Sequence, residues 1–572
     1  MRKRSLTAAA AALCVAILPA LAAHAKKTED LARLFQRPIP KQERIAHALA
    51  RLTFGPRPGD EQRVKTIGLK KWIDLQLHPD RIPENPVLTA KLQTLDSLFM
   101  TTEQLVSNYP EPQLVRQMVN GAIPFPSDPD HRMMIQKVVD RIERRQKLGD
   151  QAPPEAQELA DLLTPEQIKT LRTGTPQQRL AIFEALPPEK QDDLLLVLPG
   201  GVRQAMFVAA PPLLRRKIEL TAGPQQVVAR DLTEGKLLRA IYSDRQLEEV
   251  LTDFWFNHFN VYLDKGADHF MVTAYERDVI RPHVLGKFRD LLEATAKSPA
   301  MLFYLDNWQS VGSSAPQGRG NNARRGLNEN YGRELLELHT LGVDGGYTQR
   351  DVTEAARCFT GWTIDRPQFG GKFMFNARTH DKGEKSVLGV IIPAGGGIED
   401  GEKVLDLVAR HPSTAHFISR KLAQRFVADD PSPALVERMA QTFLKTDGDL
   451  RAVMETMLQS KEFWSQGAYR SKMKSPLELV ASAVRAVNGD VDFAEPLVNQ
   501  VAQMGEPLYR KQEPTGYSNA GRPWMNSAGL LARLNFAVNL AGNKIQGVKV
   551  ETAAGASSTE AEQLGSPEFQ KH

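Results

Sequence analysis

The sequence predicts a mainly α fold: a multi-helix globular array with a small β-ribbon near 372–392 and an inserted helical subdomain at about 100–230. Over most of the chain, apolar residues recur three and four positions apart, which is the spacing of an amphipathic helix. Prolines that follow threonine or another proline mark repeated helix starts. Strands typically show alternating apolar and polar residues bounded by turn residues, and this pattern is clear only near 372–392.

Residues 1–25 have the features of a secretory signal peptide. Residues 2–4 are cationic, the following stretch is apolar and rich in alanine, and Ala-His-Ala at 23–25 matches the small-residue pattern of a cleavage site. A membrane anchor is the competing interpretation, but Pro19 and the small residues around the cut favour removal. We therefore expect cleavage near Ala25 and a periplasmic or secreted protein, with no transmembrane segment in the mature chain.

Composition narrows the classes of function. Removal of the signal lowers the formal net charge by three, from +5 to +2, because residues 2–4 are its only charged side chains. A chain so close to neutrality gives no electrostatic reason to bind nucleic acid. Cys14 leaves with the signal, so Cys358 is alone and cannot form an intramolecular disulfide. We interpret Cys358 as a buried small hydrophobe in preference to a nucleophile.

The N-terminal half is predicted as successive helices. Helical spacing is clear at 41–53 and at 68–77, and prolines end both patterns. Between 164 and 222, threonine–proline or proline–proline pairs open short apolar runs about a dozen residues apart. Threonine is a good N-cap, and proline fits the first helical turn. Since standard helical repeats need about 34 residues or more, we interpret these runs as part of the inserted subdomain.

The central region is the most aromatic part of the chain. Long helical patterns cover 231–308, and the segment 251–262 holds the highest density of aromatic residues. Glycine, serine, asparagine and arginine then dominate 310–326, which we expect to be an exposed loop and a candidate lid.

The C-terminal part combines the ribbon with more helices. Residues 372–376 and 386–392 are expected to pair as the two strands of one β-ribbon. Helical spacing returns over 401–466, and a last helix is expected near 525–541. Small polar residues predict a disordered tail over 543–572.

The densest group of polar side chains starts at Asn328. In a regular helix over 328–342, Asn330, Glu334 and Glu337 share one face, and His339 lies near the end. A second helix follows a short glycine-containing connection. Thr348 and Asp351 predict its capping box, and it carries Glu354 and Arg357 toward the first helix.

A functional interpretation places a metal ion or an acid–base pair at these helices. Carboxylates and imidazoles suit zinc, iron or manganese, and the loop pair His380–Asp381 is expected to converge on the same place. The candidate catalytic residues are Glu334, Glu337, His339, His380 and Asp381, and the candidate metal ligands are His258, Glu334, Glu337 and His339. No cofactor other than a divalent metal is suggested by this pattern.

A structural interpretation remains open beside it. Arg333 and Arg357 would neutralise Glu334, Glu337 and Glu354 in a buried network that locks the two helices together. This view is favoured because no H-x-x-x-H or E-x-x-H pair occurs on one helix.

Two of the other candidates also have simpler explanations. His258 in its aromatic run fits a core histidine, since histidine is commonly buried at least in part. Asp381 fits a turn-stabilising residue before Gly383. The glycine-rich and nucleophile motifs of phosphate-binding, dinucleotide-binding and hydrolase folds do not occur in the sequence.

Several motifs together resemble the bacterial family called domain of unknown function 1800. They are HALARLTFGPRPGD (47–60), FWFNHFNV (254–261), NENYGRELLELHTLGVDGGYTQRDVTEAARCFTGW (328–362), FNARTHDKGEKSVLG (375–389), HFISRKLAQRFVADDPS (416–432), KSPLELV (474–480) and RPWMNSAGLLARLNFA (522–537). The resemblance covers about 41–542, and the proline-rich region at about 100–230 departs from the plainest members.

The resemblance implies an exported, mostly helical protein without an established activity or agreed catalytic residues. Members are commonly encoded beside the exported family domain of unknown function 1501, which implies a partner from that family in the envelope or in secretion. Two hypotheses for function follow. The first is a cell-envelope or secretion-associated binding protein, and the alternative is a metal-dependent hydrolase-like enzyme that uses the acidic and histidine cluster.

Overall fold

The computed structural model describes residues 32–121, 123–149, 155–313, 326–551 and 557–572. Helices form most of it, and its strands occur as two-stranded antiparallel pairs, so the prediction of a mainly α fold is confirmed. The predicted signal peptide and most of the predicted lid lie outside the described residues. Within the described ranges, no helix is both long enough and apolar enough to cross a bilayer.

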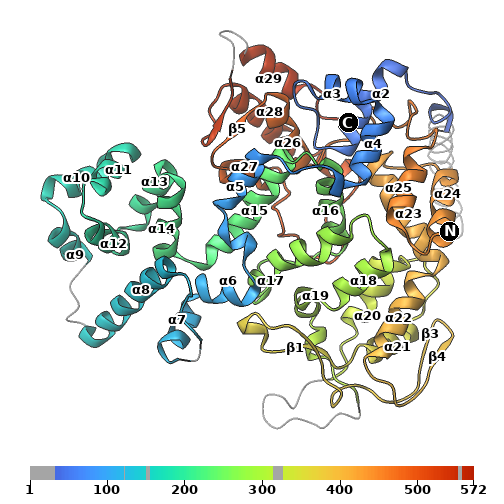
Figure 1. The fold of residues 1–572 in the computed structure, drawn as a ribbon, viewed down its shortest axis with the longest axis horizontal. Coiled ribbons are helices and arrows are strands. Elements are labelled where there is room, and N and C mark those ends of the chain that lie inside the picture. Colours follow the sequence, from blue (N-terminus) through green and yellow to red (C-terminus); the bar gives the residue numbers. More distant parts are fainter. Residues whose placement is uncertain (1–31, 122, 150–154, 314–325, 552–556) are drawn as a thin grey trace, which may run out of the picture.

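The N-terminal helices begin at the top right of the main body in Figure 1, pass its middle at α5 and then lead through α6 to a side lobe. They are α2 (Arg44–Leu52), α3 (Asp60–Ile67), α4 (Leu69–Leu77), α5 (Pro86–Gln93), α6 (Thr102–Asn108), α7 (Pro112–Val119) and α8 (Pro129–Leu148).

The side lobe continues with short helices that pack around an apolar cluster of their own. They are α9 (Glu155–Leu162), α10 (Pro165–Thr173), α11 (Pro176–Glu184), α12 (Pro188–Val197), α13 (Gly200–Ala209) and α14 (Pro212–Ala222). The expected proline starts are present, and Thr164 and Thr175 each form a capping box. Phe183, Leu194 and Phe207 belong to the cluster, which Phe493 joins from the main body.

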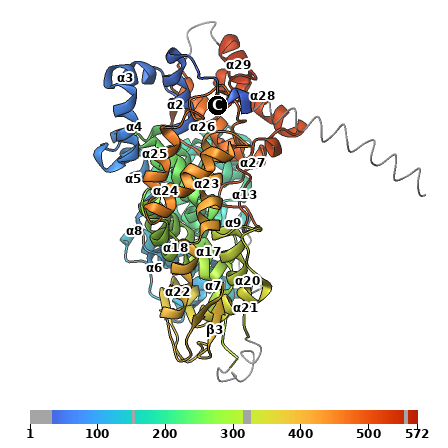
Figure 2. The ribbon, with the colours of Figure 1, turned by 90° about the vertical axis from the view of Figure 1, so that its right-hand side faces the viewer.

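The main body holds the remaining helices, with α16 and α26 inside it and α22 to α25 along one side (Figures 1 and 2). The first group is α15 (Gln225–Tyr242), α16 (Gln246–His258), α17 (Asp268–Ala274), α18 (Phe288–Ala296), α19 (Pro299–Tyr304), α20 (Asn330–Glu334) and α21 (Gln349–Cys358). The second is α22 (Glu399–Ala409), α23 (Pro412–Phe426), α24 (Pro433–Lys445), α25 (Leu450–Leu458), α26 (Pro476–Ala486), α27 (Glu495–Gln503), α28 (Ser527–Ala541) and α29 (Ser557–Gly565).

One continuous core joins sequence-distant parts of this body. It extends from Phe35 to Leu564 and includes Trp255, which is fully buried. Cys358 is also fully buried, and burial raises the pKa of its thiol to about 12. The interpretation of Cys358 as a buried small hydrophobe is therefore confirmed, because a neutral thiol is a poor nucleophile.

The predicted single β-ribbon is wrong in its pairing. Its two segments form separate hairpins: β1 (Trp362–Ile364) pairs with β2 (Phe373–Phe375), and β3 (Lys385–Val387) pairs with β4 (Val390–Ile392). The segment 386–392 folds back on itself because Leu388 (φ 50°) and Gly389 (φ 78°) form its turn, and two positive φ angles suit a tight hairpin. A further pair joins β5 (Asp490–Val491) to β6 (Val548–Lys549).

The prediction of a disordered tail over 543–572 is also wrong for the described residues. Beyond β6, α29 packs on α28 and buries Leu564. The backbone of His572 exchanges two hydrogen bonds with Lys472, at 3.2 and 2.9 Å. Small polar residues thus fold here because sequence-distant backbone groups pair with them, which composition alone cannot show.

The helix expected over 328–342 changes type in its middle. After α20, residues Leu335–Thr340 (η9) form a π-helical turn, in which the N–H of Leu341 donates to the carbonyl of Leu336. A second π-helical turn, Tyr275–Ile280 (η5), follows α17. π-helical turns are uncommon in proteins overall, but those that do occur are frequently found at functional sites.

Candidate functional site

The structure brings two of the predicted site residues together at the end of α16. His258 and His339 are both 2% exposed, and their ring centres are 6.2 Å apart. His258 Nε2 lies 3.1 Å from the carbonyl oxygen of His339. In the described part of the chain, His258 Nδ1 and His339 Nε2 have no hydrogen-bond partner.

Both imidazoles are held neutral. Burial, together with the charge of Lys421, lowers the pKa of His339 to about 3. Burial also lowers the pKa of His258 well below its usual value, again helped by Lys421. The two rings pack among aromatic side chains that include Phe259, whose ring centre is 4.5 Å from that of His258. This environment fits the core-histidine interpretation.

The predicted acidic pair lies elsewhere on the same helical segment. Glu334 and Glu337 are half-buried, and burial followed by the charge of Glu337 raises the pKa of Glu334 to about 6. Glu337 accepts a hydrogen bond from the Tyr347 hydroxyl at 3.1 Å. Among the contacts of the described residues, none joins either carboxylate to the two histidines by a hydrogen bond or ion pair.

The expected salt-bridge network forms only in part: Arg357 pairs with Glu354 at 2.8 Å, but the partners predicted for Arg333 are wrong. Arg333 lies 3.6 Å from Glu329, one turn back on the helix, instead of pairing with Glu334 or Glu337. The physical reason is the i,i+4 spacing, which places Arg333 beside Glu329 before the π-helical turn changes the register. The predicted capping box of Thr348 and Asp351 is present at the start of α21.

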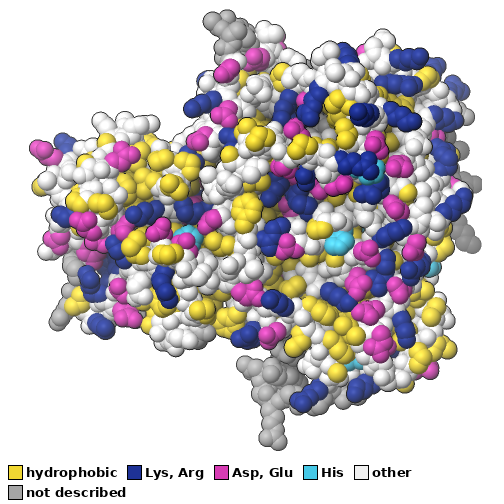
Figure 3. All heavy atoms as spheres, viewed as in Figure 1, with side chains coloured by type: hydrophobic (Ala, Val, Ile, Leu, Met, Phe, Trp, Pro, Cys, Tyr) yellow, Lys and Arg dark blue, Asp and Glu magenta, His cyan; other side chains and the backbone are white. Residues whose placement is uncertain are grey.

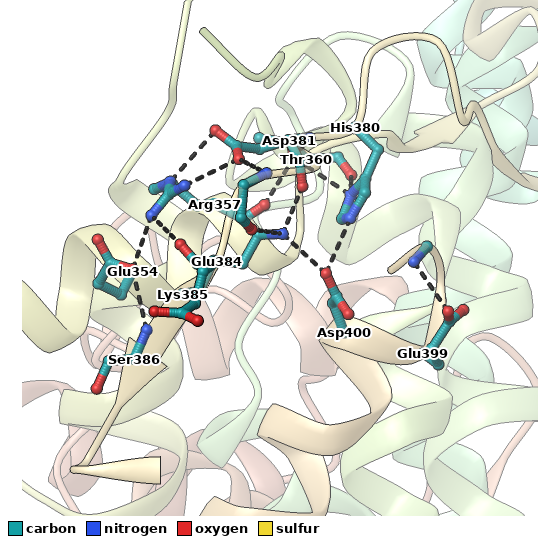
Figure 4. A network of polar contacts seen from close by, with 12 residues as sticks. Glu354, Arg357, Thr360, His380, Asp381, Glu384, Lys385, Ser386, Glu399 and Asp400 are labelled. Carbon is teal, nitrogen blue, oxygen red and sulfur yellow. Dashed lines mark hydrogen bonds and ion pairs between the residues drawn. The ribbon is translucent and has the colours of Figure 1, made fainter. Parts of the chain in front are cut away.

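His380 belongs to a separate buried network (Figure 4). Its Nδ1 lies 2.8 Å from the carbonyl oxygen of Thr360, and its Nε2 lies 3.2 Å from Asp400 Oδ2. The same carboxylate oxygen accepts from Lys385 Nζ at 2.8 Å. Asp400 and Lys385 are each 1% exposed, so the pair is almost fully removed from water.

Asp381 joins this network to α21 through Arg357. The two arginine nitrogens donate to its carboxylate at 2.9 and 3.2 Å, and Arg357 also pairs with Glu354 at 2.8 Å. Burial alone would raise the pKa of Asp381, but hydrogen bonds from Arg357 and from the Gly383 N–H lower it. The N–H of Gly383 donates at 3.0 Å, which is the turn-stabilising role weighed from the sequence.

The candidate metal ligands do not form one coordination group. Within the described ranges, no three or more His, Cys, Asp or Glu side chains are placed to hold a metal ion. His258 and His339 meet in an aromatic core, Glu334 and Glu337 lie beside Tyr347, and His380 with Asp381 belongs to the network of Figure 4.

A cleft of about 510 Å³ opens where the side lobe meets the main body. Helices α5, α14 and α15 and the residues after β5 form its walls. Its apolar lining residues are Pro86, Val87, Ala90, Leu95, Phe207, Leu238 and Phe493. We name this space the junction cleft.

Arginines and aromatic rings stack at the wall of the junction cleft. The guanidinium of Arg215 lies 4.3 Å from the ring centre of Phe493, and that of Arg230 lies 4.5 Å from Phe207. Arg215 also pairs with the exposed Asp492 at 3.2 Å. Figure 3 shows cationic and acidic side chains interspersed with apolar ones over one face of the molecule.

Glu234 is the exceptional acid of the junction cleft. Its side chain is 6% exposed, and it accepts a hydrogen bond from the N–H of Ala494 at 3.0 Å. Burial raises its pKa to about 7, and the charges of Asp231 and Glu495 add to this effect. Perturbed carboxyl groups in a cleft are frequent at functional sites.

Comparison with known proteins shows the family. A family model described as "Protein of unknown function (DUF1800)" matches residues 47–570, nearly the whole chain. The chain belongs to the DUF1800 family. No match was found among curated proteins or among solved structures. The DUF1800 match confirms the resemblance carried by the motifs, and it extends through most of the region expected to be a disordered tail.

Sequence reasoning missed the junction cleft of this DUF1800 chain. Its lining residues come from three distant stretches, near 86–95, 207–238 and 491–493, and none of them forms a motif. The one usable signal was in α15, which carries two acids, Asp231 and Glu234, among apolar residues. Only the packing of 491–493 against α15 shows that Glu234 lines a cleft.

Proposed function

We propose that this DUF1800 protein is exported and acts in the cell envelope as a binding protein, with a small organic ligand in the junction cleft. The observation that carries the proposal is the cleft itself. Its volume of about 510 Å³ falls within the range of small-molecule sites, and it lies between two packed units, where such sites are common.

The lining favours a ligand with an apolar body and one hydrogen-bond donor. Val87, Ala90 and Leu95 on one side and Leu238 on the other offer apolar contact. The cationic residues at the wall are already paired, as shown by Arg216 with Asp231 at 2.8 Å.

Glu234 is the polar group best placed to fix such a ligand. Among the contacts of the described residues, it has no ion pair, and only the N–H of Ala494 is hydrogen-bonded to it. With a pKa of about 7, it ionises readily when an amine approaches, because an adjacent positive charge favours the carboxylate. We therefore infer that the ligand donates an amine or hydroxyl group to Glu234.

The test uses n-decylamine and n-decanol as probes in calorimetric titrations. Ala90→Trp places a large side chain at an exposed lining position, and we expect it to weaken both probes by about tenfold or more. Glu234→Gln should weaken the amine by about tenfold to a hundredfold, since hydrogen bonds to charged groups contribute about 1.5–3 kcal/mol, and should leave the alcohol nearly unchanged.

The matched control is Ala434→Trp, at an exposed position of α24 outside the junction cleft. It should bind both probes as the unmodified protein does. Equal affinities for the Ala90→Trp and Ala434→Trp variants, or no binding of either probe to the unmodified chain, would contradict the proposal.

Export rests on the N-terminal 25 residues, and it has its own test. We expect the full chain, expressed in a Gram-negative host, to be recovered from the periplasm with a new N-terminus at Lys26, as read by mass spectrometry. Ala25→Arg should block cleavage, because the site requires a small residue at that position. Cytoplasmic recovery of the uncleaved chain would refute export. A partner from the family domain of unknown function 1501 stays a prediction.

A further inference from the structure

A second, smaller cavity lies in the main body, between α16 and the segment 507–524. Its volume is about 60 Å³, room for about four water molecules or for one ion of similar size. Tyr509, Tyr517 and Trp524 form aromatic parts of its wall. We name it the α16 cavity.

Three buried cations line the α16 cavity: Lys236, Arg425 and Lys472 are 9%, 7% and 2% exposed. Lys236 pairs with Asp253 at 2.9 Å, and Arg425 pairs with Glu478. Each of these cations therefore has a carboxylate partner on the same wall.

The third carboxyl of this wall is neutral. Glu506 is 7% exposed and accepts a hydrogen bond from the N–H of Leu477 at 2.8 Å. Burial, together with the charge of Asp253, raises its pKa to about 8. The third lining cation, Lys472, pairs with Asp429 at 2.7 Å, so all three have a carboxylate partner, and the neutral Glu506 can donate its proton in a hydrogen bond.

A positive excess arises behind the wall, where Lys472, Arg425 and Arg51 share two carboxylates, those of Asp429 and Glu478. Lys472 reaches Asp429 and the carbonyl of Asn519, both at 2.7 Å, yet burial and the charges of Arg51 and Arg425 lower its pKa to about 8. Arg51 is 1% exposed, and in the described structure its Nε and Nη1 atoms have no hydrogen-bond partner. An interior with surplus cations is costly unless an anion enters.

We propose that the α16 cavity binds one small oxyanion, either a free ion such as phosphate or the phosphate end of a larger ligand. Lys472 and Arg425 supply the charge, and Glu506 supplies a neutral O–H donor. Charged donors together with a protonated carboxyl make strong hydrogen bonds to an oxyanion. This site is separate from the junction cleft, and its failure leaves the proposed ligand of that cleft untouched.

The experiment titrates the full chain with inorganic phosphate and with methyl phosphate in chloride-free buffer, by calorimetry and by thermal unfolding. We expect Lys472→Met to weaken phosphate binding by about tenfold or more, because a charged donor is lost. Ser518→Trp, at an exposed position on the cavity lining, should have a comparable effect without removing any charge. It also covers the case in which Lys472→Met does not fold.

Lys403→Met, at an exposed position of α22, is the matched control and should bind phosphate as the unmodified protein does. Equal binding of the two probes shows that the cavity takes the end of a phosphate ester, whereas binding of inorganic phosphate alone shows a free ion. The proposal is overturned if the unmodified protein binds neither probe, or if Ser518→Trp binds phosphate as tightly as Lys403→Met.

Discussion

Asp400→Ala is expected to lower the free energy of unfolding by about 3–5 kcal/mol. The substitution leaves Lys385 buried without its carboxylate partner, and it also removes the acceptor that faces His380 Nε2. An unpaired ammonium in the interior loses its hydration without compensation, which is why breaking a buried pair costs more than the pair contributes. Denaturant unfolding followed by circular dichroism measures the loss.

An exposed ion pair gives the matched control. Arg410 lies 2.8 Å from Asp447, and both side chains are more than half exposed. Arg410→Ala should change the free energy of unfolding by about 1 kcal/mol or less, because water replaces the lost partner. The double variant Asp400→Leu/Lys385→Met should recover part of the loss. A change below about 1 kcal/mol in Asp400→Ala would show that the network contributes little to stability.

The unmodified protein is expected to lose stability as the pH rises from about 4.5 to about 8. Glu506→Gln is expected to remove this loss. The folded-state pKa lies above the unfolded value, so the unfolded chain releases this proton first as the pH rises. Stability therefore falls through this window and levels off above it. At about 1.4 kcal/mol for each pKa unit, the move from 4.5 to about 8 corresponds to at most about 5 kcal/mol.

The measurement is the free energy of unfolding at pH 5 and at pH 8.5 for both proteins. Glutamine keeps the oxygen that accepts from the Leu477 N–H, so the variant should fold and should be the more stable protein at pH 8.5. Glu562→Gln, at an exposed position of α29, should leave the pH dependence unchanged. If both variants follow the same pH profile, Glu506 is ionised in the folded state.

Local chemistry made much of the helical structure predictable. The capping residues Thr164, Thr175 and Thr348 act within three positions of the chain, so their sequence already contains both partners of each hydrogen bond. The pairing of the strands could not be predicted from such local patterns. The tight turn at Leu388 and Gly389 competes with the longer polar connection, and the sequence pattern does not rank the two.

The site residues show the same limit. His258 and His339 were named from their motifs, and the fold does bring them together. Glu234 and Glu506 have shifted pKa values because residues far along the chain bury them, and each accepts from a backbone N–H in another segment. No local pattern contains that information, so these acids were missed.

Because the π-helical turn η9 contains one extra residue, the position of His339 depends on whether that residue is present. A π-turn holds one residue more than the corresponding α-turn, so deletion of one amino acid between 335 and 340 would let the segment return to regular geometry. The wider turn takes up the extra residue locally, so the residues on either side of it would keep their facing and only those within the turn would move. His339 lies within the turn, so its carbonyl would take a new position relative to His258 although neither ring has been changed.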